Sequence, residues 1–445
     1  MKKDEYINTV LEQVRCKAVH EPLKAELASH IDEQAEAFIA VGLPEENAEE
    51  EAVKTMGDPV EAGVGLDSAH RPSFPLAVFL PSLILLFTGI IARHLGEGFF
   101  AFPPAYNIFI NSDIPNAIIC IAAASLFYFA DYTILVRKPK TAYAAFTLLL
   151  AVIVIWNVGR ANIANVSGTE WVTIAFRNTL SGHFAFYGSA LLVPLMCGFV
   201  FSMRGKNFKW FVLSCFVLVV PPALISLYAP CLSGAILVGI AALAIMTIAV
   251  KDDYFKVNKT TAYLFMYIPA SLAAIGLTVV KILRNIRYNG STADWEQNMI
   301  REIISEATLF GSSRVISTSL TEANNSHILT AIIAQFGLFA GITVAVILVL
   351  LPLIMLIISS RIQNRFGKLT AFSIGIVFLF MSVAFIASNL GYTTAMESFV
   401  TAPFMSNGIF NAVTSGALVG IFASVYRRKD LMPERKINTN RKANA

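Results

Sequence analysis

The residues best suited to chemistry lie at the end of one polar segment, residues 282–327, which interrupts a chain of long apolar runs. Glu322, Ser326 and His327 close this segment just before the apolar run that begins at Ile328. A carboxylate or an imidazole can remove a proton from a reacting hydroxyl, whereas a serine needs a neighbouring base. Glu322 and His327 are therefore candidate general bases, and a loop of this size is where a function is expected.

The motifs of several common enzyme classes are absent from the sequence. It contains no Walker A glycine loop, no HExxH, no GxSxG and no spaced Cys/His cluster. An ATP-driven pump and a membrane zinc protease are disfavoured for this reason. The five cysteines lack metal-ligand spacing, so they are interpreted as small apolar packing residues. We expect no metal or cofactor site and no nucleic-acid partner.

Composition separates a short acidic region from a long apolar one. The 445 residues are 56% hydrophobic and 14% charged, against roughly 45–50% and 25% in soluble domains. Residues 1–70 hold roughly sixteen acids and six bases and lack a secretory signal. We predict a cytoplasmic helical domain there, with helices over 3–19, 21–41 and 44–56 and a stop before Pro59. Residues 71–74 form the linker.

The sequence after residue 74 predicts an all-α, polytopic membrane protein, with about ten transmembrane helices that follow the small N-terminal domain. A bilayer core needs about 20 apolar residues per helix. The eighth apolar run is too long for one straight crossing, which predicts a tilt or an extension into the cytoplasm. The predicted spans are 74–93, 115–136, 142–158, 183–203, 210–228, 231–250, 262–281, 328–358, 369–389 and 408–426.

Basic residues orient these spans. They cluster in alternate loops at 137–140, 204–209, 251–259 and 361–368, and again in the tail at 429–445. With ten spans and a cytoplasmic N-terminus, all of these clusters fall on one side, as the positive-inside rule requires. The sequence therefore predicts a multi-pass protein of the cytoplasmic membrane with both termini cytoplasmic. The segment 282–327 and the segment 390–407 then face outward.

A few bases lie at the predicted outer ends of spans, against the positive-inside bias. They are Arg93 with His94, Arg160, and Lys281 with Arg284 and Arg287. Two interpretations are open. The side chains can extend along apolar surface to the interface, or they can hold an anionic lipid headgroup.

Two segments near these outer loops resemble the signatures of the SEDS family (FtsW/RodA/SpoVE). Residues 320–341, LTEANNSHILTAIIAQFGLFAG, are similar to the family pattern LPExxTDFIFAxIxEELGLxG. Residues 389–408 resemble NxGxxPxxGxxLPFxSxGG, with two extra residues between the halves. Residues 229–235, APCLSGA, are similar to QPDLGTA, and residues 167–172, SGTEWV, resemble GAxRWI. The resemblance covers residues 75–428, and residues 1–70 resemble a permease prefix domain.

The resemblance implies a role in peptidoglycan assembly, in division, cell shape or sporulation. SEDS proteins polymerise glycan strands from lipid II on the outer membrane face, together with a class B penicillin-binding protein. The implied partners are lipid II and such a protein, and a Mg²⁺ ion could enter with the diphosphate. Residues at signature positions are the implied substrate-binding set: Asn389, Gly391, Pro403, Phe404, Ser406, Gly408, Trp171 and Pro230.

The chain departs from the family pattern where the chemistry should lie. The family's essential Asp falls on Ser326, and the Asp of QPDLG falls on Cys231. The sequence thus favours a diverged SEDS protein that binds a lipid-linked precursor or a partner without polymerising glycan. Two alternatives stay open. One is an active glycosyltransferase in which Glu322 or His327 replaces the Asp, and the other is a lipid flippase or permease.

Overall fold

The computed structural model describes residues 1–15, 17, 20–69, 74–95, 112–166, 171–229, 231–287, 292–311, 326–392 and 399–428. The chain divides into a unit that contains Met1–Phe74 and a unit that comprises Pro75–Val425. Each unit is described by itself. The candidate residues Glu322 and Pro230 lie outside the described residues, as do residues 71–73 of the predicted linker and the basic tail 429–445.

The N-terminal unit is a small helical bundle. Its helices are α1 (Lys3–Gln13), α2 (His20–Ala40), α3 (Glu45–Thr55) and α4 (Pro59–Ala69). Apolar residues one helical turn apart on α1 and α2 form most of the core: Tyr6, Ile7, Val10, Leu11, Leu23, Leu27 and Ile31. The Tyr6 hydroxyl donates to the carbonyl of Met56, 3.1 Å away, which fixes the end of α3 against α1.

The helix α4 was missing from the prediction, which treated Pro59 only as a stop signal. Proline is also well suited to the first position of a helix, because its missing N–H has no helical partner there. The Asp58 carboxylate accepts from the backbone N–H of Val60 and Glu61, at 2.7 and 3.2 Å. This is an N-cap, so Pro59 begins α4, whereas α3 has already ended at Thr55, two residues before Gly57 with its φ of +81°. Asp67 in α4 then accepts from the Arg15 backbone N–H at 3.0 Å.

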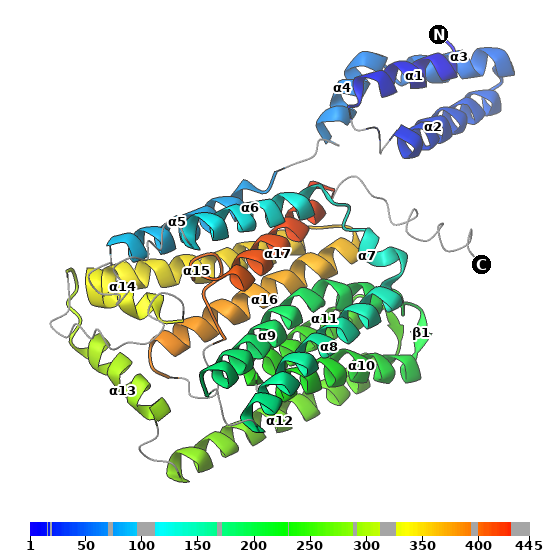
Figure 1. The fold of residues 1–445 in the computed structure, drawn as a ribbon. Coiled ribbons are helices and arrows are strands. Elements are labelled where there is room, and N and C mark those ends of the chain that lie inside the picture. The colour runs from blue at the N-terminus through cyan, green and yellow to red at the C-terminus, as the bar shows by residue number, and fades with distance from the viewer. Residues whose placement is uncertain are drawn as a thin grey trace. The chain divides into compact units, whose positions relative to one another are not determined.

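The second unit is a bundle of long apolar helices (Figure 1). Its elements are α5 (Leu76–Leu95), α6 (Ile114–Phe129), α7 (Ile134–Arg137), α8 (Pro139–Val166), α9 (Trp171–Phe201), β1 (Lys206–Asn207), α10 (Phe208–Tyr228), α11 (Leu232–Lys251), β2 (Phe255–Lys256), α12 (Lys259–Arg287), α13 (Thr292–Ser305), α14 (Ile328–Phe336), α15 (Leu338–Ser360), α16 (Arg365–Asn389) and α17 (Ile409–Arg427). Within the described residues, nine helices are long and apolar enough to cross a membrane, and α6 is a shorter apolar helix. The predicted all-α polytopic membrane fold is confirmed.

Among the nine candidate spans of the described residues, α9, α16 and α17 are the most buried and α12 is the least buried. Two glycines one turn apart allow α17 to contact α6 backbone to backbone. A Cβ added at Gly416 would lie 2.3 Å from the carbonyl oxygen of Cys120, and one at Gly420 would lie 2.5 Å from that of Ala124. Small residues at such spacing let membrane helices pack closely where lipid provides no hydrophobic driving force.

The eighth apolar run differs from the prediction of one tilted or extended helix. It is two helices, α14 and α15, separated at Gly337. Gly337 has φ of +91°, and a Cβ there would lie 2.7 Å from the carbonyl oxygen of Leu309. Because a side chain fits neither the backbone conformation nor the space, glycine ends α14 here. The short α14 is thereby set apart from the helix that crosses the bundle.

Figure 1 places α13 and α14 at one end of the bundle, and α7 with the strands β1 and β2 at the other. The two strands pair in parallel over two residues each. At this end the Tyr254 hydroxyl donates to the carbonyl of Arg365 at 2.9 Å, and Lys368 pairs with Asp252 at 3.3 Å. These contacts join α16 to the α11–β2 turn.

Candidate functional site

The first cluster of candidate residues lies where α16 ends beside the start of α14. Asn389, the last residue of α16, is fully buried. Its Nδ2 donates to the carbonyl of Ser326 at 2.8 Å and to that of Phe385 at 3.0 Å. Its Oδ1 accepts from the backbone N–H of Thr330 at 3.0 Å and from the Thr330 hydroxyl at 3.1 Å. Two segments 59 residues apart in sequence are thus held by one amide.

Asn389 replaces the missing N-cap of α14. The first residues of a helix carry N–H groups without helical partners, usually satisfied by the side chain that precedes the helix. His327 precedes α14 and makes no such bond, so the Thr330 N–H is satisfied from α16 instead. The buried amide therefore fixes both the position of Ser326 and the direction of α14.

Ser326 and His327 are brought together with Asn389, and all three side chains are buried, with His327 7% exposed. Ser326 occupies the position at which the resemblance implies a carboxylate. A neutral hydroxyl cannot take up a proton as a carboxylate does, and His327 is the titratable group next to it in the described chain. The hydrogen bonds of Asn389 hold a short polar segment inside an apolar bundle. The titratable side chain next to Ser326 in this segment is an imidazole rather than a carboxylate.

Gly391 is held by a cation from α13. Arg301 donates from Nε and Nη2 to the Gly391 carbonyl at 3.1 and 2.7 Å. Gly391 has φ of +73°, and a Cβ there would lie 2.9 Å from Cγ of Arg301. A glycine is required at this point by backbone conformation and by contact. Arg301 was only one of several charges in the predicted loop, and its role appears once α13 folds against the end of α16.

The second cluster is the segment 399–408, which precedes α17 and contains Pro403, Phe404, Ser406 and Gly408. Except for the half-buried Asn407 and Gly408, it is buried. The Ser406 hydroxyl accepts from the backbone N–H of Ala402 at 2.9 Å, and Asn411 of α17 donates to the carbonyls of Ala402 and Ser406 at 2.9 Å each. The segment is therefore folded back on itself as a compact turn.

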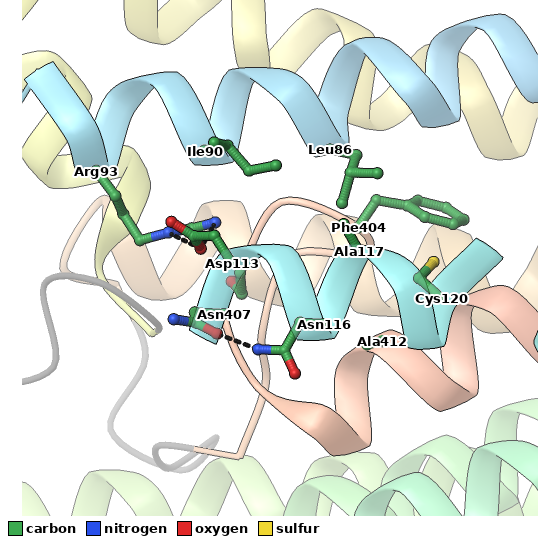
Figure 2. A pocket seen from close by; sticks show the side chains of 11 residues that line it. Leu86, Ile90, Arg93, Asp113, Asn116, Ala117, Cys120, Phe404, Asn407 and Ala412 are labelled. Carbon is green, nitrogen blue, oxygen red and sulfur yellow. Dashed lines mark hydrogen bonds and ion pairs between the residues drawn. The ribbon is translucent and has the colours of Figure 1, made fainter. Parts of the chain in front are cut away.

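A buried ion pair lies beside this turn (Figure 2). Arg93, at the end of α5, reaches Oδ1 of Asp113 from Nη2 at 2.7 Å and from Nε at 2.8 Å. Each residue is 2% exposed. Asn116 donates to Oδ1 of Asn407, which also accepts from Ser112 at 2.8 Å.

The polar groups around the ion pair line a cavity of about 10 Å³, roughly the room of one water molecule. Both interpretations of Arg93 as an interfacial or headgroup-binding base are wrong, because its guanidinium is buried and paired within the protein. The sequence offered one signal for this pair. A base at the end of one predicted span is followed by an acid at the start of the next.

A third group lies in the middle of α9. Tyr187 hydrogen-bonds to the Thr401 hydroxyl, and the His183 ring packs against Phe399 and Phe410 at centroid distances of 5.3 and 5.8 Å. The segment 399–408 thus contacts α9 as well as α5. Trp171 is the first residue of α9. Among the described residues, no group of three His, Cys, Asp or Glu could hold a metal ion, so no step is assigned to Mg²⁺.

Comparisons with known proteins agree with the expected fold. No family model matches the chain, and no curated protein matches it. Among solved structures, the rod shape determining protein RodA of Thermus thermophilus is similar, with 13% sequence identity and a TM-score of 0.51. A variant of RodA with one aspartate replaced by alanine is also similar, with 13% sequence identity and a TM-score of 0.53. A chain from a peptidoglycan synthase complex, studied for its coordination of polymerization and crosslinking, gives 14% and 0.54. Each alignment covers 80% of this chain and 98% of the other.

The fold is therefore that of a polytopic membrane protein of the SEDS type. Among these structures, RodA has the same fold over 80% of this chain. The expected SEDS fold is confirmed. The assignment of residues 1–70 to a permease prefix domain stays a prediction.

Proposed function

We propose that this protein is a diverged SEDS-type protein of bacterial cell-envelope assembly that binds lipid II on the outer face of the cytoplasmic membrane without polymerising glycan. The observation that carries the proposal is the environment of Ser326. A SEDS-type fold holds this residue, through Asn389, where the resemblance implies a carboxylate. Glycosyl transfer needs a base for the acceptor hydroxyl, and serine cannot fill that role.

Binding of the precursor does not depend on that carboxylate. Recognition of a lipid-linked diphosphate needs polar groups and a shaped surface at the membrane boundary, together with apolar surface for the polyprenyl tail. In the turn 399–408, Asn407 and Gly408 are half-buried and can face a ligand, while the buried hydrogen bonds of the turn and of the α14–α16 junction fix the backbone. A scaffold role beside a class B penicillin-binding protein follows the same reasoning, because a non-polymerising paralogue can deliver or retain the precursor for a partner.

The test is to give labelled lipid II to the purified full-length protein in proteoliposomes, with and without candidate class B penicillin-binding proteins. Bound lipid II is measured by fluorescence, and glycan products are sought by gel electrophoresis. The proposal expects saturable binding and no polymer. Absence of binding under conditions in which a polymerising SEDS protein binds would refute it.

An active transferase is the second candidate, and the location of His327 favours it. A buried imidazole next to Ser326 could serve as the base if it faces the acceptor, and Glu322 is the alternative carboxylate of the sequence. Polymer that disappears in His327→Ala or Glu322→Ala would establish this function and refute the non-polymerising role. His30→Ala, in the N-terminal unit, is the matched control and should leave any polymer unchanged.

A further inference from the structure

The backbone of the 399–408 turn packs against α5 at Gly89. A Cβ added at Gly89 would lie 2.2 Å from the carbonyl oxygen of Met405, so the turn touches the helix where a side chain is missing. Arg93 lies one helical turn further along the same face. Its Nη1 donates to that same carbonyl at 2.7 Å. The Met405 carbonyl is therefore seated over Gly89 and held by Arg93.

The turn needs such an anchor because its backbone is strained. Phe404, the residue before Met405, has φ of +63°. A non-glycine residue in this region is strained and persists only where its surroundings impose the conformation. The Phe404 ring stacks on Phe378 of α16 at a centroid distance of 5.7 Å. Phe404 is thus fixed by α16 on its side chain, and its backbone is fixed by α5 through Met405.

Asp113 keeps the Arg93 guanidinium in place. Both residues are buried, and a charge buried in low dielectric is tolerated only when it is paired. Because Nε and Nη2 both bind Oδ1 of Asp113, the guanidinium plane is fixed and Nη1 is aimed at Met405. A lysine, with a single nitrogen at the end of a flexible stem, cannot reproduce this fork geometry.

We propose that Arg93 and Asp113 are positioning residues that set the conformation of the 399–408 turn. Through this turn they determine the surface that Asn407 and Gly408, its half-buried residues, present to a ligand. The role in lipid II recognition rests on the proposed function. The role in holding the turn does not, since it follows from contacts within the chain.

Three variants of the full-length protein separate positioning from general stability. Arg93→Lys keeps a positive charge beside Asp113 but loses the planar guanidinium, whose separate nitrogens bind Asp113 and Met405. The double variant Arg93→Met with Asp113→Leu removes both charges together, which avoids an unpaired buried charge. Ser82→Ala is the matched control, because this buried α5 hydroxyl bonds only within its own helix, to Val78, among the described contacts.

Three measurements are made on each variant: thermal unfolding, hydrogen exchange at the backbone amides of Met405 and Ser406, and lipid II binding. We expect Arg93→Lys and the double variant to melt close to the parent protein, to exchange these amides at least about tenfold faster, and to bind lipid II about tenfold more weakly, equivalent to about 1.4 kcal/mol. Ser82→Ala should match the parent in all three measurements.

Unchanged exchange in both Arg93 variants would overturn the proposal, as would an equal acceleration in Ser82→Ala. If the double variant does not fold, Arg93→Lys alone decides between these outcomes. Parent protein that fails to bind lipid II, combined with accelerated exchange in Arg93→Lys, would refute the proposed function while supporting the positioning role. The two inferences can therefore fail separately.

Discussion

The strongest stability prediction concerns the Asn389 amide, whose hydrogen bonds should be the main polar contacts between α14 and α16. In Asn389→Ala the Ser326 carbonyl and the Thr330 N–H lose the partner described for them. Each buried group left unsatisfied costs about 1–3 kcal/mol, so the loss should be about 2–6 kcal/mol. The Phe385 carbonyl adds nothing to this sum, since as a helical carbonyl it also has a backbone donor four residues on.

Thr330→Val provides a graded comparison at the same contact. It removes one hydroxyl, which bonds to the backbone carbonyl and the Oδ1 of Asn389 at 2.9 and 3.1 Å, and it leaves the N–H bond in place. One hydrogen bond contributes about 1 kcal/mol net. Asn389→Asp keeps an acceptor for the Thr330 N–H, but it places a carboxylate oxygen against the carbonyls of Ser326 and Phe385. A buried carboxylate without a cationic partner is costly, so this variant should also melt below Thr330→Val.

The assay is thermal unfolding of the three variants in one detergent at one scan rate, because membrane proteins of this size often unfold irreversibly. Hydrogen exchange at the Thr330 amide provides a local check. The expected midpoint of Thr330→Val is the highest of the three, and those of Asn389→Asp and Asn389→Ala both lie below it. If Asn389→Ala melts with or above Thr330→Val, the amide does not cap α14 as described, and the reasoning fails.

The other predictions concern single backbone positions. In Gly391→Ala the positive φ and the clash with Arg301 should cost at least about 1–2 kcal/mol and loosen α13, measured as faster proteolysis between α13 and α12. Gly337→Ala places a Cβ against Leu309 and should lower the thermal midpoint more than Gly239→Ala, where the space is open. Asp58→Ala should cost about 1 kcal/mol, seen as faster hydrogen exchange at the start of α4; unchanged exchange there would contradict the N-cap.

The sequence by itself determined the membrane architecture. A run of about 20 apolar residues in a bilayer satisfies its backbone polar groups by forming a helix, so the polytopic all-α fold could be predicted. Of the ten spans predicted, nine are long enough to cross a membrane within the described residues, and α6 is shorter. The signature segments also indicated the SEDS fold that the structural comparisons confirm. Local sequence rules were less successful at Pro59, which the prediction treated only as a stop signal although it begins α4.

Only the tertiary structure decided how the candidate residues are grouped. The Asn389 amide meets Ser326 across 63 residues, and Arg93 meets Met405 across 312. Neither partner can be read from spacing, because hydrogen bonds between distant helices depend on which faces pack together. The same holds for Gly337. Its sequence neighbours are ordinary helix formers, and the break follows from the approach of Leu309. The residue types at the site were thus visible in the sequence, but the contacts that fix their positions come from the packing of the bundle.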